Sequence, residues 1–332
     1  MVIEGKYLIV GGTEDKAVHI LVLQNENTTL KCIGKIELNK RPSCIAVHPT
    51  TKELWIGDKF GDVYGIDFTK DFDVNCTEPK VVKQPAPKMG HLAMLTGMIV
   101  DEKYIISSDR DEKIRVTNYP EYYVVHNFCL GHTEMVSSIC LATEDCKYSV
   151  ELMIDLWIVL VSASTDKTLK VWKYLSDADD ALKFSYECGE SSCPHVVETI
   201  TLGGIKLVLV LYENSDNIQV LQLNTETAEL TGKYTIPVSS EVLNFRVTKQ
   251  DSDKVQITLF TIGAQNLHLI ELSIDESKEL KHQVLSSSSL GLPFSKEDLV
   301  LDNIYSSLIR KVESKKPEKN DGEEKQTKKH KK

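Results

Sequence analysis

The sequence predicts an all-β protein built as a propeller of similar blades, and three observations support this fold class. A strand–turn–strand pattern recurs along the chain, and the intervals between successive turns are 46, 50, 55, 49 and 49 residues. About forty to fifty residues is the length of one four-stranded propeller blade. Within each copy, apolar and polar residues alternate, which is typical of strands with one buried face. The turns lie near Asp15, Gly61, Asp111, Asp166, Ser215 and Ala264.

The clearest copy of the repeat covers residues 160–172, where an alternating strand enters a polar turn and a second strand ends on Trp172. Two further copies cover residues 105–116 and 54–64. Weaker copies with the same hydrophobic pattern lie at residues 7–23, 207–223 and 257–272. Six units are therefore visible. A ring of six blades, a seventh blade formed by the N-terminus with residues 286–309, and an incomplete N-terminus are all compatible with this count.

The joints between units carry a second recurring mark. Gly90-His91 and Gly131-His132 stand at two joints, 41 residues apart, as the Gly-His pairs of WD repeats do. In WD repeats a histidine, a strand serine or threonine, a turn aspartate and a tryptophan form a buried hydrogen-bonded set, because a buried imidazole or indole N–H needs a partner. The residues that fit these places are His132, Ser162, Asp166 and Trp172. We therefore predict a WD-repeat β-propeller in which this set is structural, and not a catalytic His–Asp pair.

The character of the chain changes after the last repeat, so three segments are expected. The propeller covers residues 1–294. Ser295 to Asp298 reads as a capping box, and Leu301, Ile304, Leu308 and Val312 then fall on one helical face, so residues 295–313 are expected to form an amphipathic helix. Residues 314–332 are Lys-rich with almost no apolar side chains, and we expect them to be disordered.

Composition excludes several classes of protein. The chain has 332 residues, of which 41% are hydrophobic, and no apolar run reaches the roughly 18 residues that span a bilayer. The N-terminus lacks the basic-then-apolar order of a signal peptide, and the eight cysteines are expected to be reduced. The formal charge of -10 divides into +5 over residues 310–332 and -15 over the rest. A secreted, membrane or collagen-like protein is excluded, and so acidic a body is poorly suited to wrap nucleic acid by itself.

Motifs for catalysis and for cofactor binding are absent. The sequence has no Gly-x-Gly-x-x-Gly, no Gly-Lys-Ser/Thr phosphate loop and no Gly-x-Ser-x-Gly elbow. Cys188, Cys193 and His195 come closest to a metal-binding group, but their spacing suits no common zinc motif, and free thiols in a loop are the preferred interpretation. We expect a protein that is not an enzyme, with no cofactor and no metal of its own.

The turn of the third unit is unusually charged. Residues 109–115 contain six charged side chains, and the turn one unit earlier carries Asp58, Lys59 and Asp62. One interpretation is a solvated hairpin whose charges pair locally for little energy. The other is an electrostatically selective protein interface. Charge by itself favours the first interpretation.

Four motifs in order give the sequence a more specific resemblance. They are residues 58–64 (DKFGDVY), 90–95 (GHLAML), 108–115 (SDRDEKIR) and 128–134 (FCLGHTE). Together they resemble the non-catalytic WD-repeat subunit of tRNA guanine-N7 methyltransferase, a family that includes the animal proteins called Wuho. The resemblance is dense over residues 54–172, patchy elsewhere, and returns at Asp302 through Lys311. Blade geometry does not demand the charged motif at 108–115, since it would accept many polar turns there.

The resemblance implies a seven-bladed propeller that forms a heterodimer with a separate catalytic subunit, which binds S-adenosylmethionine. This propeller would stabilise the catalytic subunit and help to position tRNA for N7 methylation of a guanine in the variable loop, in the nucleus. The residues that match the family's charged contact are Lys59, Arg110, Asp111, Glu112, Lys113 and Arg115. Two departures from the family are an N-terminus shorter by about one blade and Thr117 in place of a tryptophan.

A second function remains open. A general nuclear WD-repeat adaptor, such as a ubiquitin-ligase substrate receptor or a chromatin scaffold, would explain the propeller and the basic tail equally well. It would not explain the linked motifs of the third unit. The run Lys328 to Lys332 fits an import signal, a contact to tRNA phosphate, or a solvated tail with neither role.

Overall fold

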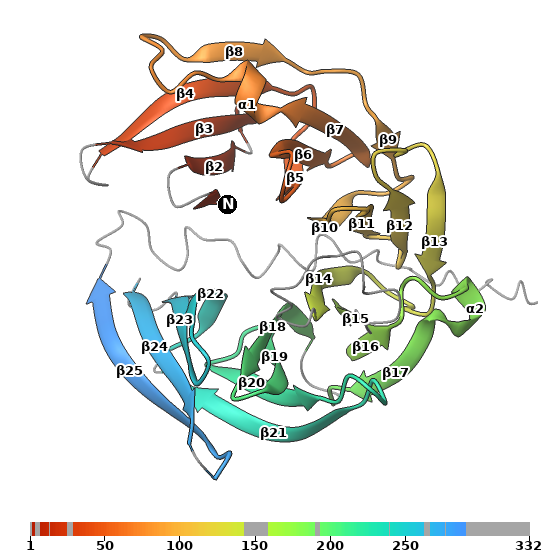
Figure 1. The fold of residues 1–332 in the computed structure, drawn as a ribbon, viewed down its shortest axis with the longest axis vertical. Coiled ribbons are helices and arrows are strands. Elements are labelled where there is room, and N and C mark those ends of the chain that lie inside the picture. Colours follow the sequence, from red (N-terminus) through yellow and green to blue (C-terminus); the bar gives the residue numbers. More distant parts are fainter. Residues whose placement is uncertain are drawn as a thin grey trace, which may run out of the picture.

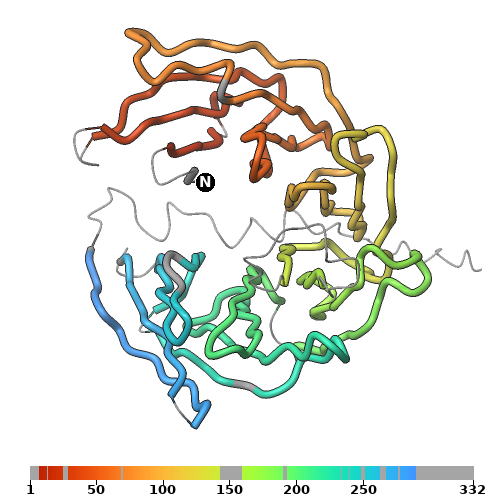
Figure 2. Tube along the Cα trace, viewed as in Figure 1, coloured from red at the N-terminus to blue at the C-terminus, as the bar shows by residue number. Residues whose placement is uncertain are grey.

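The structure, a computed structural model, describes residues 2–3, 7–12, 14–24, 29–142, 159–189, 193–238, 240–261, 266–275 and 277–289. These residues form six sheets placed one after another around a ring, each running from an inner strand at the centre to an outer strand at the rim (Figure 1). The tube in Figure 2 follows the same course, from blade 1 in red round to blade 6 in blue. The predicted fold class, an all-β propeller, is confirmed.

Each blade is a continuous stretch of chain except blades 1 and 2, because one strand of blade 1 lies in the chain between the third and fourth strands of blade 2. Blade 1 contains β1 (Val2–Ile3), β2 (Tyr7–Gly12), β3 (Ala17–Gln24), β4 (Thr29–Glu37) and the later strand β8 (Lys80–Lys83). Blade 2 contains β5 (Pro42–Val47), β6 (Glu53–Asp58), β7 (Asp62–Asp67) and β9 (Met89–Gly90). Blade 3 contains β10 (Leu95–Val100), β11 (Tyr104–Asp109), β12 (Ile114–Asn118) and β13 (Val125–Cys129).

The second half of the ring repeats this order without insertions from other blades. Blade 4 contains β14 (Val136–Ala142), β15 (Val159–Ser164), β16 (Thr168–Trp172) and β17 (Leu182–Glu187), with the short helix α2 (Ala178–Ala181) before its outer strand. Blade 5 contains β18 (Pro194–Leu202), β19 (Ile205–Tyr212), β20 (Asn217–Leu223) and β21 (Leu230–Pro237). Blade 6 contains β22 (Val242–Gln250), β23 (Lys254–Thr261), β24 (Asn266–Ile274) and β25 (Leu280–Ser289).

The core lies between the blades. Alternate residues of a strand point to opposite faces of its sheet, so each blade presents one row of aliphatic side chains to a neighbour. Blades 5 and 6 share such a layer, which includes Leu209, Phe245 and Ile257, all with at most 1% of their surface exposed. Burying one such side chain stabilises the fold by about 1.5–3 kcal/mol. Packing of sheet on sheet therefore holds the ring together.

An insertion ties blade 2 to blade 1. After β7 the chain forms helix α1 (Phe68–Asp71) and then crosses to blade 1, where β8 pairs in parallel with β4, from Gly34 opposite Lys80 to Glu37 opposite Lys83. Phe68 and Phe72 are buried against blade 1 on this path. A Cβ at Gly34 would lie 2.1 Å from Cδ1 of Phe72, so glycine is required for this approach. Nothing in the repeat pattern indicated this fifth strand.

The turns predicted from the repeat join the second and third strands of their blades. This holds for the turns near Asp15, Gly61, Asp111, Asp166 and Ser215, and the sixth, near Ala264, lies outside the described residues. These turns share one face of the ring with the joints between blades: the backbone N–H of His91 donates to the Gly61 carbonyl at 2.8 Å. We call this the turn face.

Two of the predicted segments are not described. The helix expected at residues 295–313 and the tail at 314–332 both lie outside the described residues, so the three expected boundaries stay predictions. Among the helices that the structure does describe, none is long and apolar enough to cross a membrane.

Candidate functional site

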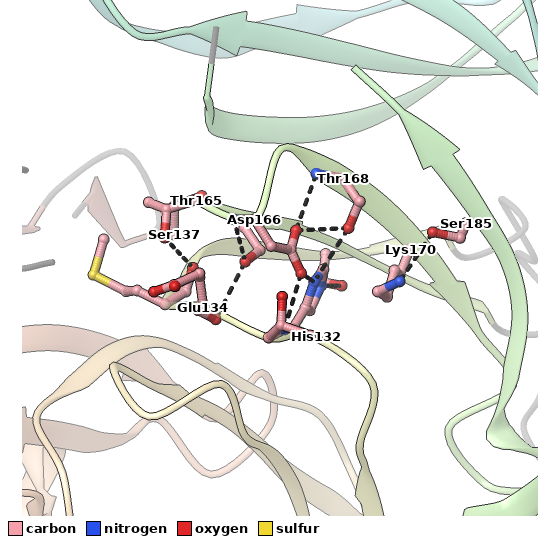
Figure 3. A network of polar contacts seen from close by, with 12 residues as sticks. His132, Glu134, Ser137, Thr165, Asp166, Thr168, Lys170 and Ser185 are labelled. Atoms are coloured by element: carbon pink, nitrogen blue, oxygen red, sulfur yellow. Dashed lines mark hydrogen bonds and ion pairs between the residues drawn. The ribbon is translucent and has the colours of Figure 1, made fainter. Parts of the chain in front are cut away.

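The four residues predicted to form a WD set lie together in blade 4, and Figure 3 shows two of them, His132 and Asp166. His132 places Nδ1 2.8 Å from Oδ2 of Asp166 and Nε2 2.7 Å from Oγ of Ser162, and Trp172 donates its indole N–H to the same Oγ at 2.8 Å. A carboxylate only accepts, so the imidazole proton sits on Nδ1 and the Ser162 hydroxyl donates to Nε2. The set thus fixes one tautomer of His132.

Asp166 is the centre of this network. Its Oδ1 accepts the Thr168 hydroxyl at 2.7 Å and the Thr168 N–H at 3.0 Å (Figure 3). Its Oδ2 also accepts the Thr133 N–H at 3.1 Å. Burial raises the pKa of Asp166, but the hydrogen bonds from His132 and Thr168 outweigh it and hold the pKa below its ordinary value. Ser162 is fully buried, so no substrate reaches its hydroxyl. We call this hydrogen-bonded set of His132, Ser162, Asp166 and Trp172 a structural lock. It has no geometry for nucleophilic catalysis.

Blade 3 contains a similar lock that sequence patterns alone did not single out. His91 places Nδ1 2.9 Å from Oδ2 of Asp109 and Nε2 2.7 Å from Oγ of Ser107. Thr117 stands where blade 4 has its tryptophan. It is the cross-strand partner of Ile105, as Trp172 is the cross-strand partner of Leu160 in blade 4. The Thr117 hydroxyl is buried with no hydrogen-bond partner among the described residues.

The aspartate of blade 3 is two residues earlier than the repeat alignment suggests. Alignment places Asp111 at the position of Asp166, yet the histidine of blade 3 contacts Asp109. The other oxygen of Asp109 accepts the backbone N–H groups of Asp111 at 2.9 Å and Lys113 at 3.0 Å, which closes the turn. The Gly90-His91 pair was the available signal, because a histidine at a joint requires a buried acceptor nearby.

The same turn closure occurs in blade 2. Asp58 Oδ1 accepts the N–H groups of Phe60 at 2.7 Å and Asp62 at 3.1 Å, and its Oδ2 accepts the Tyr64 hydroxyl at 2.9 Å. The two turns are therefore fixed from beneath by buried carboxylates. Their remaining side chains project from a rigid base, which reduces the entropy lost when they contact a partner.

The structure brings the sequence-predicted interface residues of blade 3 together at the tip of its turn. Arg110 Nε lies 3.9 Å from Oδ1 of Asp111, and Lys113 Nζ donates to the Asp111 carbonyl at 3.1 Å. Glu112 is exposed and has a φ of 62°, in the left-handed region. Lys59 is exposed on the turn of blade 2. Local pairing therefore uses part of the charge, as the solvated-hairpin interpretation requires.

Arg115 differs from the other charged residues of this group. It lies on β12, beneath the turn, and its Nη1 donates to the Gly90 carbonyl at 2.8 Å. Its Nε and Nη2 atoms are buried and have no hydrogen-bond partner among the described residues. Burial lowers the pKa of Arg115 against the opposing effect of Asp109. Buried N–H groups without a partner are costly, and an acceptor supplied from outside the chain would relieve that cost.

Apolar side chains lie next to this charge. Phe60 is 60% exposed at the blade 2 turn, and Leu92 is fully exposed at the joint between blades 2 and 3. The two loops touch, since a Cβ at Gly61 would lie 2.4 Å from the His91 carbonyl oxygen. Lys40 Nζ lies 4.0 Å from the centre of the Phe60 ring. An apolar centre with a charged rim on a rigid base is the usual composition of a protein–protein interface.

We call this surface the turn patch. It consists of Lys59, Phe60, Leu92, Arg110, Asp111, Glu112, Lys113 and Arg115.

The cysteine-rich joint between blades 4 and 5 shows no metal geometry in its described part. No group of three or more His, Cys, Asp or Glu side chains suited to a metal ion occurs in the described ranges. Burial raises the pKa of Cys188 to about 11 and lowers the pKa of His195 to about 4. Cys193 donates its thiol to the Thr165 carbonyl, with Sγ 3.6 Å from the oxygen. These groups are neutral at pH 7 and serve as small half-buried side chains.

Solved structures show similarity at the level of the fold. The WD40 β-propeller domain of Doa1 has a TM-score of 0.57 and 12% identity, over 88% of this chain and 81% of that chain. The computationally designed protein Ika8 also has a TM-score of 0.57 and 12% identity, over 86% of this chain and 72% of that chain. At this identity the similarity supports the propeller fold alone.

Curated relatives carry a functional name. A protein of Kluyveromyces lactis named tRNA (guanine-N(7)-)-methyltransferase non-catalytic subunit TRM82 is 27% identical over 326 residues. Proteins with the corresponding name ending in wuho are 32% identical over 238 residues in Aedes aegypti and 28% identical over 275 residues in Drosophila melanogaster. These matches cover 94%, 69% and 80% of this chain. The chain spans 71%, 53% and 57% of the length of the three relatives.

A family model gives the same result over most of the propeller. The model described as the tRNA methyltransferase TRM82 WD40 domain matches residues 1–89 and 75–264. The two matched ranges together include five whole blades, the beginning of the sixth and every residue of the turn patch. The chain therefore belongs to the family of the tRNA methyltransferase TRM82 WD40 domain.

Proposed function

We propose that this chain is the non-catalytic subunit of a tRNA (guanine-N7)-methyltransferase, and that the turn patch holds the catalytic subunit. Family membership supports the role, because the relatives are named as non-catalytic subunits of that enzyme. The single observation that carries the site is Arg115, a half-buried residue whose Nε and Nη2 atoms are buried with no hydrogen-bond partner among the described residues, beneath the turn of blade 3.

The chemistry of the patch defines what the partner must offer. An acidic side chain would accept from Arg115, and an apolar side chain would cover Phe60 and Leu92. Charge-assisted hydrogen bonds to a guanidinium are stronger than neutral ones and specific in direction. The surrounding charges, Lys113 and Glu112 among them, would fix the register and speed the encounter.

The remaining roles follow from the division between a catalytic subunit and this non-catalytic chain. The catalytic subunit would bind S-adenosylmethionine, and this chain would bind no cofactor. The pair would be a heterodimer that places the tRNA variable loop at the catalytic centre, in the nucleus. The acidic body leaves most tRNA contacts to the partner. The propeller would hold the partner's tRNA-binding segments in their working geometry and so lower the entropy lost on binding.

The test is co-expression with the organism's candidate catalytic subunit, followed by copurification and methyl transfer to tRNA. Changing Arg115→Met removes the unpaired donors while keeping the aliphatic stem, and Arg115→Glu reverses the charge. We expect both to weaken the complex at least about 30-fold, because losing one side of a desolvated charged pair costs 2 kcal/mol or more.

The matched control is Lys103→Glu, an exposed residue of the same blade at the opposite end of its strands. We expect it to leave binding unchanged, and all three variants to unfold in a single transition. Full copurification and activity of both Arg115 variants would overturn the docking assignment. Activity of the catalytic subunit that is the same with and without this chain would overturn the function and favour a general adaptor.

A further inference from the structure

The outer layer of blade 2 is short. Its fourth strand, β9, has two residues and pairs only with Asp62 and Val63, whereas the outer strand of blade 3, β13, has five residues. Arg115 on β12 donates to the Gly90 carbonyl of β9, so this face of blade 3 is the one turned towards blade 2. β9 is therefore too short to cover the outer part of that face.

Three apolar side chains are exposed there. Val125 is 42% exposed, Phe128 is 37% exposed and Leu130 is 54% exposed. Phe128 is the cross-strand partner of Arg115, and Val125 is the cross-strand partner of Thr117, so both lie on the face turned towards blade 2. Leu130 follows two residues after Phe128, just past the end of β13. We call Val125, Phe128 and Leu130 the rim strip.

Blade 4 has a polar residue where the rim strip has Phe128. Lys170 and Arg115 occupy equivalent places, since each is the cross-strand partner of the lock serine in its own blade. The outer-strand partner of Lys170 is Ser185, whose hydroxyl accepts from the ammonium at 2.9 Å (Figure 3). Phe128 offers Arg115 no such acceptor. The Arg115 Nε and Nη2 atoms, which have no partner among the described residues, thus accompany an apolar side chain in a place that can hold a hydrogen-bonding one.

The outer strand of blade 3 also lacks the charge that other outer strands carry. β8, β17, β21 and β25 each contain at least one lysine, a residue that keeps sheet edges from associating. Residues 122–133, which include β13, contain no Asp, Glu, Lys or Arg, in a chain of which 27% is charged. An uncharged apolar surface at the rim of an acidic protein is suited to association with another protein.

We propose that the rim strip binds the catalytic subunit beside the turn patch, through an apolar row of that subunit that stands next to an acidic side chain for Arg115. The proposal rests on the function proposed above. Continuity with the turn patch selects this occupant, since Phe128 and Arg115 are cross-strand neighbours. Charge complementarity selects it as well, because an acidic group on the partner supplies the acceptor that this chain does not give to Nε and Nη2 of Arg115.

The contact is made by side chains and not by an added strand. The Phe128 N–H, on the outermost strand of blade 3, donates to Oδ1 of Asn127 at 2.8 Å. Asn127 is itself held in place, because its Nδ2 donates to the Tyr174 carbonyl of blade 4 at 3.2 Å. A main-chain donor that an incoming strand would need is therefore already occupied.

The experiment compares Phe128→Ser, which gives blade 3 the residue of blade 4, with Val125→Ser and the unchanged chain. Each is co-expressed with the catalytic subunit, and the dissociation constant of the complex is measured by dilution. We expect Phe128→Ser to weaken the complex at least about tenfold and Val125→Ser about threefold, because a large side chain is lost from the contact in one and a small one in the other. The matched control is Val81→Ser, a 53% exposed valine on the outer strand of blade 1, which should leave binding unchanged.

The stability of this chain by itself separates binding from folding. We expect the urea midpoint of Phe128→Ser not to fall, because the new hydroxyl can accept from Arg115 as Ser185 accepts from Lys170. A midpoint that falls together with the affinity would overturn the proposal and assign Phe128 a structural role.

Two further outcomes distinguish this inference from the proposed function. Unchanged affinity in Phe128→Ser and Val125→Ser, with a weaker complex in Arg115→Met, would overturn the rim strip and leave docking at the turn patch intact. Unchanged affinity in all three would overturn both. A dimer of this chain in light scattering that Phe128→Ser abolishes would also overturn the proposal, because a second copy would then cover the strip.

Discussion

Two buried threonines differ in whether their hydroxyl group has a hydrogen-bond partner. Thr168 donates to Asp166 at 2.7 Å, whereas the Thr117 hydroxyl has no partner among the described residues. Valine has nearly the same shape and no hydroxyl. We expect Thr168→Val to lower the free energy of unfolding by about 1–2 kcal/mol, and Thr117→Val to raise it by up to about 1 kcal/mol, since an unpaired buried hydroxyl is removed. Urea denaturation of both variants measures the difference, and effects of the same sign would contradict the assignment.

Histidines set the pH dependence of stability between pH 7 and pH 4. Burial lowers the pKa of His195 to about 4, and burial also lowers the pKa of His132 despite the opposing effect of Asp166. In the unfolded chain both titrate near pH 6.5. Below that pH the unfolded state binds more protons, so stability is full above about pH 6.5 and is lost as the pH falls towards the folded pKa.

We therefore expect the free energy of unfolding to decrease as the pH falls from 7 to 5, and the slope to be smaller in a His195→Leu variant. One proton corresponds to at most about 1.4 kcal/mol per pH unit. Asp166 does not contribute in this range, because a carboxyl whose folded pKa is depressed loses its stabilisation only below about pH 4. Urea titrations at three pH values give the slopes, and equal slopes would show that His195 is not held neutral.

At the scale of elements, the contact between Gly34 and Phe72 tests whether the insertion that contains β8 packs against blade 1 in solution. Gly34→Ala would place a Cβ 2.1 Å from Phe72, and we expect a loss of about 1–3 kcal/mol from overpacking. In the Phe72→Ala background the ring is gone, so the same glycine change should cost little. A double-mutant cycle by thermal unfolding measures this coupling, and additive effects would show that the two residues do not touch in solution.

At the scale of the whole molecule, charge separates the body from the tail. Residues 1–309 carry a net charge of -15 and residues 310–332 carry +5. We expect a chain of residues 1–309 to leave tRNA unshifted in a native gel at about 150 mM salt. Any shift by the full chain should disappear as salt is raised. Retardation of tRNA by residues 1–309 would mean that the body itself binds RNA, through local basic groups that the net charge conceals.

The turn patch shows how far sequence reasoning reaches at a functional surface. Its charged members follow from the motifs at residues 58–64 and 108–115, because the fold gains no stability from six charges in one hairpin turn. Phe60 and Leu92 belong to the quoted motifs but gave no signal of exposure by themselves. Their role, and that of the buried Nε and Nη2 atoms of Arg115, which have no partner among the described residues, depends on burial, which sequence spacing does not report.

The sequence by itself determined the fold class, five described turns and the four residues of the blade 4 lock. Those features are local: strand alternation, turn residues and a fixed repeat length specify them without knowledge of distant contacts. Only the tertiary structure decided that Asp109, and not Asp111, accepts the hydrogen bond of His91. It also decided that β8, which lies in the chain between two strands of blade 2, pairs with β4 of blade 1. Both outcomes depend on which groups meet in the folded chain, because buried donors and apolar faces select their partners by position in space and not by order in the chain.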